Sequence, residues 1–294
     1  MKTLSVDQNF LGLPDELSAF EAAKSVVLPI PYEATTSYIQ GTASGPNAIL
    51  AASQQVEFYD DELKCEPCRT GISTANFLRP NEANHAENLV QIQEEAEAHY
   101  SSGKFVLSLG GEHSITIPLV RAANKVFGDF SVLQLDAHSD LRDSYEGSQL
   151  NHACVMARVN EICDFVGVGL RSGVQGEEKG IRSGSRLFYA SEMQKGGDWR
   201  QSAVDALGEN VYLTFDLDFF DPSIMPSVGT PEPGGFFWYN TLEFLKEVFR
   251  TKNVFAADIV ELSPLFGLIH PDFLAAKLAY KFIGYKHCLD SSQI

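Results

Sequence analysis

Histidine and aspartate side chains gather in three short segments, each of which follows an apolar run of the chain. The segments are Gly110-Gly111-Glu112-His113-Ser114, Asp136-Ala137-His138-Ser139-Asp140 and Asp216-Leu217-Asp218. Alternate residues of an extended chain share one face, so the acidic and histidine side chains of the second segment point the same way. Burying like-charged carboxylates together is costly unless cations neutralise them. We therefore predict a metal site built from His113, Asp136, His138, Asp140, Asp216 and Asp218.

This set of candidate ligands contains aspartates and histidines but no cysteine. Oxygen-rich ligation with two imidazoles favours Mn²⁺ over Zn²⁺, and it leaves Co²⁺, Ni²⁺ and Fe²⁺ as alternatives. Six ligands are too many for one ordinary site that also holds a water. They suit two ions about 3.5–4 Å apart, with carboxylates and a hydroxide bridging them.

Two more residues lie where they can serve such a site. Glu261 ends the apolar stretch VFAADIVEL, so its carboxylate is either a buried ion-pair partner or a group that binds substrate. His152, in Asn151-His152-Ala153, follows the second segment and is a candidate to carry protons, because imidazole titrates near neutral pH.

Short apolar runs alternate along the chain with longer amphipathic stretches. The strand-like runs are Ser25–Pro29, Lys104–Leu109, Phe130–Leu135, Asp164–Leu170, Arg186–Ala190, Asn210–Phe215 and Asn253–Leu262. The helix-like stretches are Gly45–Phe58, His85–Ser101, Thr116–Phe127, Met193–Leu207, Thr241–Thr251 and Asp272–Tyr285. Continuous apolar runs are typical of strands buried on both faces of a parallel sheet, so this order predicts a three-layer α/β fold. Ligands of such sheets bind at the carboxyl ends of the strands, where the candidate ligands lie.

Composition excludes several classes of function. The chain has 294 residues, with 39 acidic against 22 basic side chains and a net charge of -17. Such a surface repels nucleic acid and anionic membranes, and no apolar run approaches the roughly 18 residues that span a bilayer. The start MKTLSVDQNF has no secretory signal pattern, and five cysteines do not make a disulfide framework, so we expect a cytoplasmic protein. Cys65 and Cys68 are expected in a surface loop, with a redox role left open.

Five motifs together resemble the ureohydrolase family, which contains arginases and agmatinases. They are GGEHS, LDAHSD, FDLDFFDP, GTPEPGG (229–235) and DIVELSP, and their order and spacing match the family over nearly the whole chain. The resemblance implies one catalytic domain over residues 1–294. It also implies a three-layer α/β/α fold with a mostly parallel eight-stranded sheet, assembled into a homotrimer or homohexamer.

The resemblance further implies hydrolysis of a guanidino compound to urea and an amine, by attack of a hydroxide that bridges two Mn²⁺ ions, with Co²⁺ or Ni²⁺ as alternatives. One ion is then held by His113, Asp136, Asp140 and Asp216, and the other by His138, Asp136, Asp216 and Asp218, so that Asp136 and Asp216 bridge. Glu261 matches the carboxylate that holds the guanidinium group. Asp140 is placed to accept a hydrogen bond from the hydroxide, and His152 matches the family's acid/base residue.

Within the family, GGEHS and TPEPGG resemble agmatinases more than arginases. The expected substrate is therefore a cationic guanidino compound, agmatine first, cleaved to putrescine and urea in polyamine biosynthesis. Aminopropylagmatine, guanidinobutyrate, arginine and formimino compounds stay as alternatives. Arg142 stands where arginases commonly have an asparagine that helps bind the amino acid head group, and we expect Arg142 to pair with its neighbour Asp143.

Overall fold

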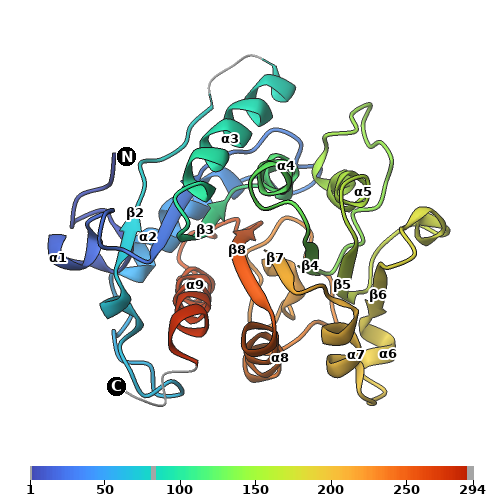
Figure 1. Ribbon diagram of the computed structural model, residues 1–294. Coiled ribbons are helices and arrows are strands. Elements are labelled where there is room, and N and C mark those ends of the chain that lie inside the picture. Colours follow the sequence, from blue (N-terminus) through green and yellow to red (C-terminus); the bar gives the residue numbers. More distant parts are fainter. Residues whose placement is uncertain (1, 81–83, 290–294) are drawn as a thin grey trace.

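The computed structural model describes residues 2–80 and 84–289, and in this part of the chain one parallel sheet of eight strands forms the centre of the molecule (Figure 1). The strand order is β2-β1-β3-β8-β7-β4-β5-β6, and every neighbouring pair is parallel. The strands are β1 (Ser25–Ile30), β2 (Ile72–Thr74), β3 (Phe105–Gly110), β4 (Ser131–Leu135), β5 (Phe165–Leu170), β6 (Arg186–Tyr189), β7 (Asn210–Asp216) and β8 (Asn253–Val260).

Helices cover both faces of the sheet, which confirms the three-layer α/β/α prediction. One face carries α3 (His85–Tyr100), α4 (Thr116–Phe127) and α5 (Val155–Asn160). The other carries α6 (Ala190–Met193), α7 (Trp199–Ala206), α8 (Trp238–Thr251) and α9 (His270–Cys288), with α2 (Gly45–Ser53) packed against α9 and the short α1 (Asp15–Ser18) at the edge of the molecule. In residues 2–80 and 84–289, none of these helices has the length and apolar content that a membrane span requires.

The sheet divides the apolar core into two clusters of buried side chains, one under each helical layer. Strands β1, β3, β4 and β5 are buried along their whole length. Both faces of these strands are covered, so their sequences are continuous apolar runs rather than alternating ones. The edge strand β6 is partly exposed, whereas the other edge strand, β2, is buried.

Three details of the predicted elements are different in the structure. Strand β2 was not predicted, because three residues are too few to give a periodic signal. Helix α5 was also not predicted. The predicted helix Met193–Leu207 is two helices, α6 and α7, separated by Gly196 and Gly197, whose φ angles of 91° and 96° lie outside the helical range.

The segment that carries Cys65 and Cys68 is not simply a surface loop. Cys68 is 1% exposed, and its backbone N–H donates to the hydroxyl of Tyr280 in α9 at 3.1 Å. Pro67 packs against the same helix, because a Cβ at Gly284 would lie 3.1 Å from its ring. The expected surface loop is therefore wrong for Cys68, while Cys65 is half-buried and both thiols are free.

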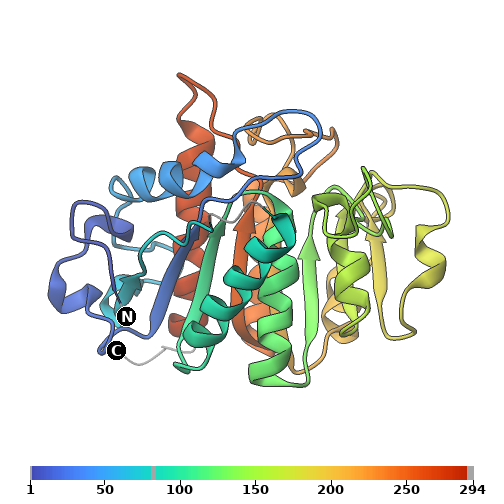
Figure 2. The ribbon, with the colours of Figure 1, turned by 90° about the horizontal axis from the view of Figure 1, so that it is seen from above.

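The strand order determines where the candidate site residues meet. Strands β3, β8, β7 and β4 are consecutive neighbours in the sheet. Their carboxyl ends carry the GGEHS, DIVELSP, FDLDFFDP and LDAHSD motifs respectively. Loops gather over this edge of the sheet, including the segment that follows β1 (Figure 2).

Candidate active site

His113 begins a single 3₁₀ turn, His113–Ile115, directly after β3. The chain approaches the segment after β1 very closely here, since a Cβ at Gly111 would lie 2.0 Å from the carbonyl oxygen of Tyr32. Only glycine fits at that position. The backbone N–H of His113 donates to Glu261 Oε1 at 2.6 Å, which joins the end of β3 to the end of β8.

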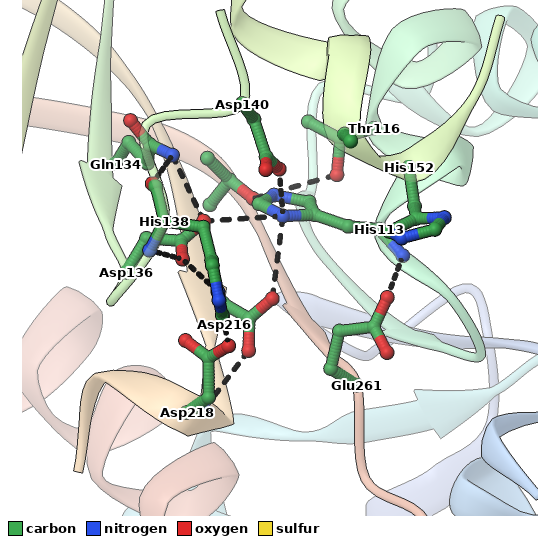
Figure 3. Close-up of polar contacts among 12 residues, drawn as sticks. His113, Thr116, Gln134, Asp136, His138, Asp140, His152, Asp216, Asp218 and Glu261 are labelled. Atoms are coloured by element: carbon green, nitrogen blue, oxygen red, sulfur yellow. Dashed lines mark hydrogen bonds and ion pairs between the residues drawn. The ribbon is translucent and has the colours of Figure 1, made fainter. Parts of the chain in front are cut away.

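One ring nitrogen of His113 faces three carboxylates (Figure 3). His113 Nδ1 lies 3.3 Å from Asp136 Oδ2, 3.0 Å from Asp140 Oδ2 and 3.3 Å from Asp216 Oδ2. The nitrogen is buried, yet none of these contacts within the described residues has the geometry of a hydrogen bond. His113, Asp136 and Asp140 thus form one group whose potential ligand atoms all lie within 4.8 Å of one another, and Asp216 approaches the same ring nitrogen.

The other ring nitrogen shows which atom of His113 carries the proton. His113 Nε2 lies 2.9 Å from Thr214 Oγ1, and that hydroxyl donates its own proton to Asp258 Oδ1 at 2.7 Å. Thr214 can then only accept from the ring, so Nε2 holds a hydrogen and Nδ1 is the nitrogen that faces the carboxylates. Burial alone lowers the pKa of His113, but the Asp136, Asp140 and Asp216 carboxylates outweigh it and raise that pKa well above its usual value, so a metal at Nδ1 would displace a proton. An imidazole nitrogen with carboxylate oxygens gathered around it suits a divalent cation.

A second group of possible ligands lies beside the first and shares Asp136 with it. His138 Nδ1 lies 2.7 Å from Asp218 Oδ2 and 3.7 Å from Asp136 Oδ1. The two groups of closely spaced ligand atoms are His113, Asp136 and Asp140, and Asp136, His138 and Asp218. Asp216 approaches His113, while its Oδ1 accepts from the backbone N–H of Asp218 at 2.9 Å.

The charge state of the cluster indicates that it requires cations. Burial and the charges of Asp218 and Asp140 raise the pKa of Asp136 to about 7. Burial also raises the pKa of Asp216 well above its usual range, with the charges of Asp218 and Asp136 adding to it. Burial alone lowers the pKa of His138, but the Asp218 carboxylate outweighs it and raises that pKa to about 11. Positive charge is in short supply among these buried carboxylates, so metal ions would stabilise them.

The surrounding chain holds the ligands in place. Gln134 Nε2 donates to Asp136 Oδ2 at 2.8 Å and to the carbonyl of His138 at 3.0 Å. Asp140 and Glu261 have φ angles of 49° and 67°, in the left-handed region that non-glycine residues rarely adopt. Such strain is concentrated at functional sites, where the surrounding structure maintains it.

A pocket opens above the cluster, with five of the six predicted ligands on its floor. His113, His138, Asp140, Asp216 and Asp218 line it, whereas Asp136 lies beneath and does not. The wall contains both remaining predicted residues, His152 and Glu261, and also Arg142, Tyr145, Glu177 and Glu232. The structure thus brings every predicted site residue to one place (Figure 3).

Glu261 reaches the pocket from the end of β8 and is 8% exposed. Burial raises its pKa to about 8, against the hydrogen bond from the His113 N–H. That hydrogen bond uses Oε1, and no hydrogen bond within the described residues uses Oε2. A buried carboxylate with a free oxygen in a pocket can bind a cationic group.

The expected pairing of Arg142 with Asp143 is wrong. Asp143 Oδ1 pairs with Arg158 Nη2 at 2.8 Å instead, and the guanidinium of Arg142 lies over the ring of Tyr145, 4.7 Å from its centroid. Neighbouring side chains of an extended loop point to opposite sides, which separates the two charges. Arg142 is therefore exposed at the rim of the pocket.

The sequence analysis did not identify two charged residues that bind the backbone of segments near the pocket. Arg171, after β5, donates through Nη2 to the carbonyl oxygens of Asp218 at 2.5 Å and Glu232 at 3.0 Å. Glu33, after β1, accepts from the backbone N–H groups of Gly41 at 2.9 Å and Ala43 at 3.1 Å. Both are charged residues just beyond a strand end, the same signal that identified the predicted ligands.

Comparisons with known proteins agree with this site. A model described as the Arginase family matches residues 23–284. An N(1)-aminopropylagmatine ureohydrolase of Synechocystis sp. is 42% identical over 92% of this chain and 92% of its own length. An agmatinase of Pyrococcus horikoshii is 34% identical, over 89% of this chain and 92% of its own. The crystal structure of an agmatine ureohydrolase of Thermoplasma volcanium superposes with a TM-score of 0.83 at 30% identity, covering 100% of this chain and 97% of that one.

Proposed function

The chain belongs to the arginase family, and we propose that it is a ureohydrolase that uses two metal ions to release urea from a guanidino compound with an amine-bearing tail. One observation carries the proposal: His113 Nδ1 lies within 3.3 Å of oxygens of three buried carboxylates, beside a pocket that His113, Asp140 and Asp216 line. The second imidazole, His138, lies beside them, and Glu261 stands in the wall.

We assign one ion to His113, Asp136, Asp140 and Asp216, and the other to His138, Asp136, Asp216 and Asp218. Asp136 lies in both groups of ligand atoms, which supports its role as a bridge. Mn²⁺ suits these ligands best, with Co²⁺ and Ni²⁺ as alternatives. When bound, the two ions would lower the pKa of a shared water so that it is a hydroxide nucleophile near neutral pH.

The protein's own groups bind the substrate and move protons. A guanidinium group stays protonated at physiological pH, and the Glu261 carboxylate can hold it by charge-assisted hydrogen bonds. Asp140, at the pocket floor, is placed to accept a hydrogen bond from the nucleophile. His152, in the wall, is placed to give a proton to the departing amine nitrogen.

Two further carboxylates in the pocket support the proposal that the substrate has a positively charged tail. Glu177 and Glu232 line the same pocket as the metal cluster. Glu177 Oε2 accepts from Ser139 Oγ at 2.6 Å and from the backbone N–H of Val174 at 2.9 Å, so the carboxylate is held in position. Glu177 also lines a second hollow, together with Tyr189.

These two carboxylates favour a substrate with two amine groups beyond its guanidinium. The relative named for N(1)-aminopropylagmatine is 42% identical, against 34% for the agmatinase. We therefore place aminopropylagmatine first and agmatine second, which reverses the order expected from the motifs alone. Either substrate would place the protein in polyamine biosynthesis. We further propose that the chain forms a single catalytic domain and acts in the cytoplasm. The homotrimer or homohexamer stays part of the proposal, with exposed Phe266 and Ile269 as candidate subunit contacts.

Urea release from four substrates tests the proposal. With Mn²⁺ present, kcat/KM should be highest for aminopropylagmatine, then agmatine, and at least about tenfold lower for guanidinobutyrate and arginine, because a desolvated like-charge contact with Glu177 or Glu232 is costly. A preference for guanidinobutyrate would indicate that Arg142 binds a carboxylate tail of the substrate, and it would contradict the amine-tail proposal. Absence of urea from all four would contradict the ureohydrolase assignment itself.

Metal binding should release protons and weaken in acid. Without metal, the pKa of His138 is raised to about 11 and that of Asp136 to about 7, so both hold protons that a metal must displace. Affinity for Mn²⁺ should therefore fall as the pH drops through about 7. Calorimetric titration of metal-free protein, in buffers of different ionisation enthalpy at pH 6.5 and 8, measures the released protons. Equal affinity at both pH values, with no proton release, would contradict this.

A further inference from the structure

Glu112 is a fully buried carboxylate that does not belong to the metal cluster. Its Oε2 accepts from the backbone N–H groups of Ala34 and Thr35, both at 2.6 Å. Its Oε1 accepts from the hydroxyls of Thr35, at 2.8 Å, and Ser114. Four donors converge on this one side chain, so it acts as an anionic acceptor that joins the segment after β1 to the segment after β3.

The Thr35 hydroxyl connects Glu112 to His152. A hydroxyl has one proton, and Thr35 gives it to Glu112. Its oxygen is then left to accept, and it lies 3.0 Å from the backbone nitrogen of His152 and 3.2 Å from the ring nitrogen Nδ1. Nδ1 must therefore carry the hydrogen, and Nε2 of the neutral ring keeps its lone pair.

The remaining contacts hold the ring in that orientation. His152 Nε2 lies 3.4 Å from Ser37 Oγ, which lines the same pocket. The ring of Tyr145 packs edge-on against the His152 ring, with centroids 6.2 Å apart. Behind it, His85 of α3 contacts both the Tyr32 hydroxyl at 2.6 Å and the Leu150 carbonyl at 2.7 Å, which ties together the segments that carry Thr35 and His152.

We propose that Glu112 and Thr35 are positioning residues that hold His152 in the tautomer with Nδ1 protonated and Nε2 free toward the substrate. The inference rests on the proposed function, in which His152 moves a proton. Nε2 takes up a proton from the water-derived hydroxyl and gives it to the amine nitrogen as the bond from that nitrogen to the guanidinium carbon breaks. The ring then returns to the same tautomer, because Nδ1–H stays on Thr35 throughout. With Thr35 absent, Nδ1 loses the acceptor that the described residues place beside it, and the Ser37 hydroxyl at Nε2 can accept a hydrogen there instead.

The Thr35→Val variant tests this relay from Glu112 through the Thr35 hydroxyl to His152, because valine keeps the shape of threonine and removes only the hydroxyl. We expect it to retain two metal equivalents and a KM near that of the wild type, while kcat falls about 10–100-fold, as for other lost orienting hydrogen bonds. Thr35→Ser should restore kcat, because serine keeps the hydroxyl. Thr251→Val, which removes a hydroxyl that contacts the Glu247 carbonyl at the end of α8, is the matched control and should change nothing.

A double-mutant cycle with His152→Asn separates positioning from general support of the fold. If Thr35 acts through the imidazole, Thr35→Val should lower kcat in the wild type but not in the His152→Asn background. Carbethoxylation of His152 by diethyl pyrocarbonate in the metal-free protein, followed by peptide mass spectrometry, should also slow in Thr35→Val, because fewer rings have Nε2 unprotonated.

An equal loss of kcat in both backgrounds, or an unchanged kcat in Thr35→Val, would overturn the relay while leaving the ureohydrolase assignment intact. A wild-type protein that releases no urea from any guanidino compound would overturn the proposed function and this inference with it.

Discussion

The Asp216→Asn variant is expected to lose metal from both positions and to release urea only at background level. Asp216 ends β7 with Oδ2 3.3 Å from His113 Nδ1, and the proposed ligand sets place it between the two ions. An asparagine has one carbonyl oxygen and no charge, so it cannot bridge two cations as a carboxylate does. The loss should exceed the roughly 10²–10⁴-fold expected for removal of a general acid or base, because the nucleophile itself depends on the ions.

Metal analysis of the purified variant, together with a urea assay, checks this result. Asp205→Asn is a matched control, because Asp205 is an exposed residue of α7 whose carboxylate accepts only from Gln201 within the described chain. The control should keep two metal equivalents and full activity. Two full equivalents in Asp216→Asn would contradict the bridging role and leave Asp136, which lies in both groups of ligand atoms, as the bridge.

The fold was predictable from the sequence because burial leaves a local signal. Strands β3, β4 and β5 are covered on both faces, so each is a largely apolar run that is visible without knowledge of its neighbours. Strand β2 has only three residues and pairs with β1 alone, and its position depends on that pairing rather than on its own pattern. The break between α6 and α7 was present in the sequence as Gly196-Gly197, but the predicted helix extended across it.

The candidate ligands were predictable for the same reason. Asp136, His138 and Asp140 alternate within one extended segment, so their shared direction follows from backbone geometry. The three segments come together because each follows a strand, and parallel strands end at one edge of the sheet.

The supporting contacts were not predictable, because they join residues that no local spacing relates. Thr35 lies 77 positions from Glu112 and 117 from His152, yet its hydroxyl contacts both. Arg142 shows the converse error: the neighbouring Asp143 suggested a pair, while the partner of Asp143 is Arg158, 15 positions away. Side-chain direction within a loop is set by the fold around it, and sequence adjacency does not indicate it.

The Glu261→Gln variant is expected to keep both metals but to bind and turn over the guanidinium group poorly. Glu261 stands in the pocket wall with its backbone at a φ of 67°, and Oε1 is held by the His113 N–H at 2.6 Å. A glutamine oxygen can still accept that hydrogen bond, so the fold should persist while the negative charge is lost. Loss of one partner of a buried charge pair costs about 2–5 kcal/mol, which is roughly a 30- to 4000-fold decrease in kcat/KM.

Inhibition by two small molecules distinguishes charge recognition from a structural role of Glu261. Guanidinium ion carries the charge of the substrate's reacting group, whereas urea has a similar shape and is neutral. If Glu261 binds the charge, Glu261→Gln should weaken inhibition by guanidinium ion far more than inhibition by urea. Glu209→Gln is the control and should affect neither, because Glu209 lies in the loop between α7 and β7, at the edge of the sheet where the strands begin and opposite the edge that carries the pocket. Equal weakening of both inhibitors, or a wild-type kcat/KM with both metals present, would show that Glu261 serves only to hold the His113 backbone.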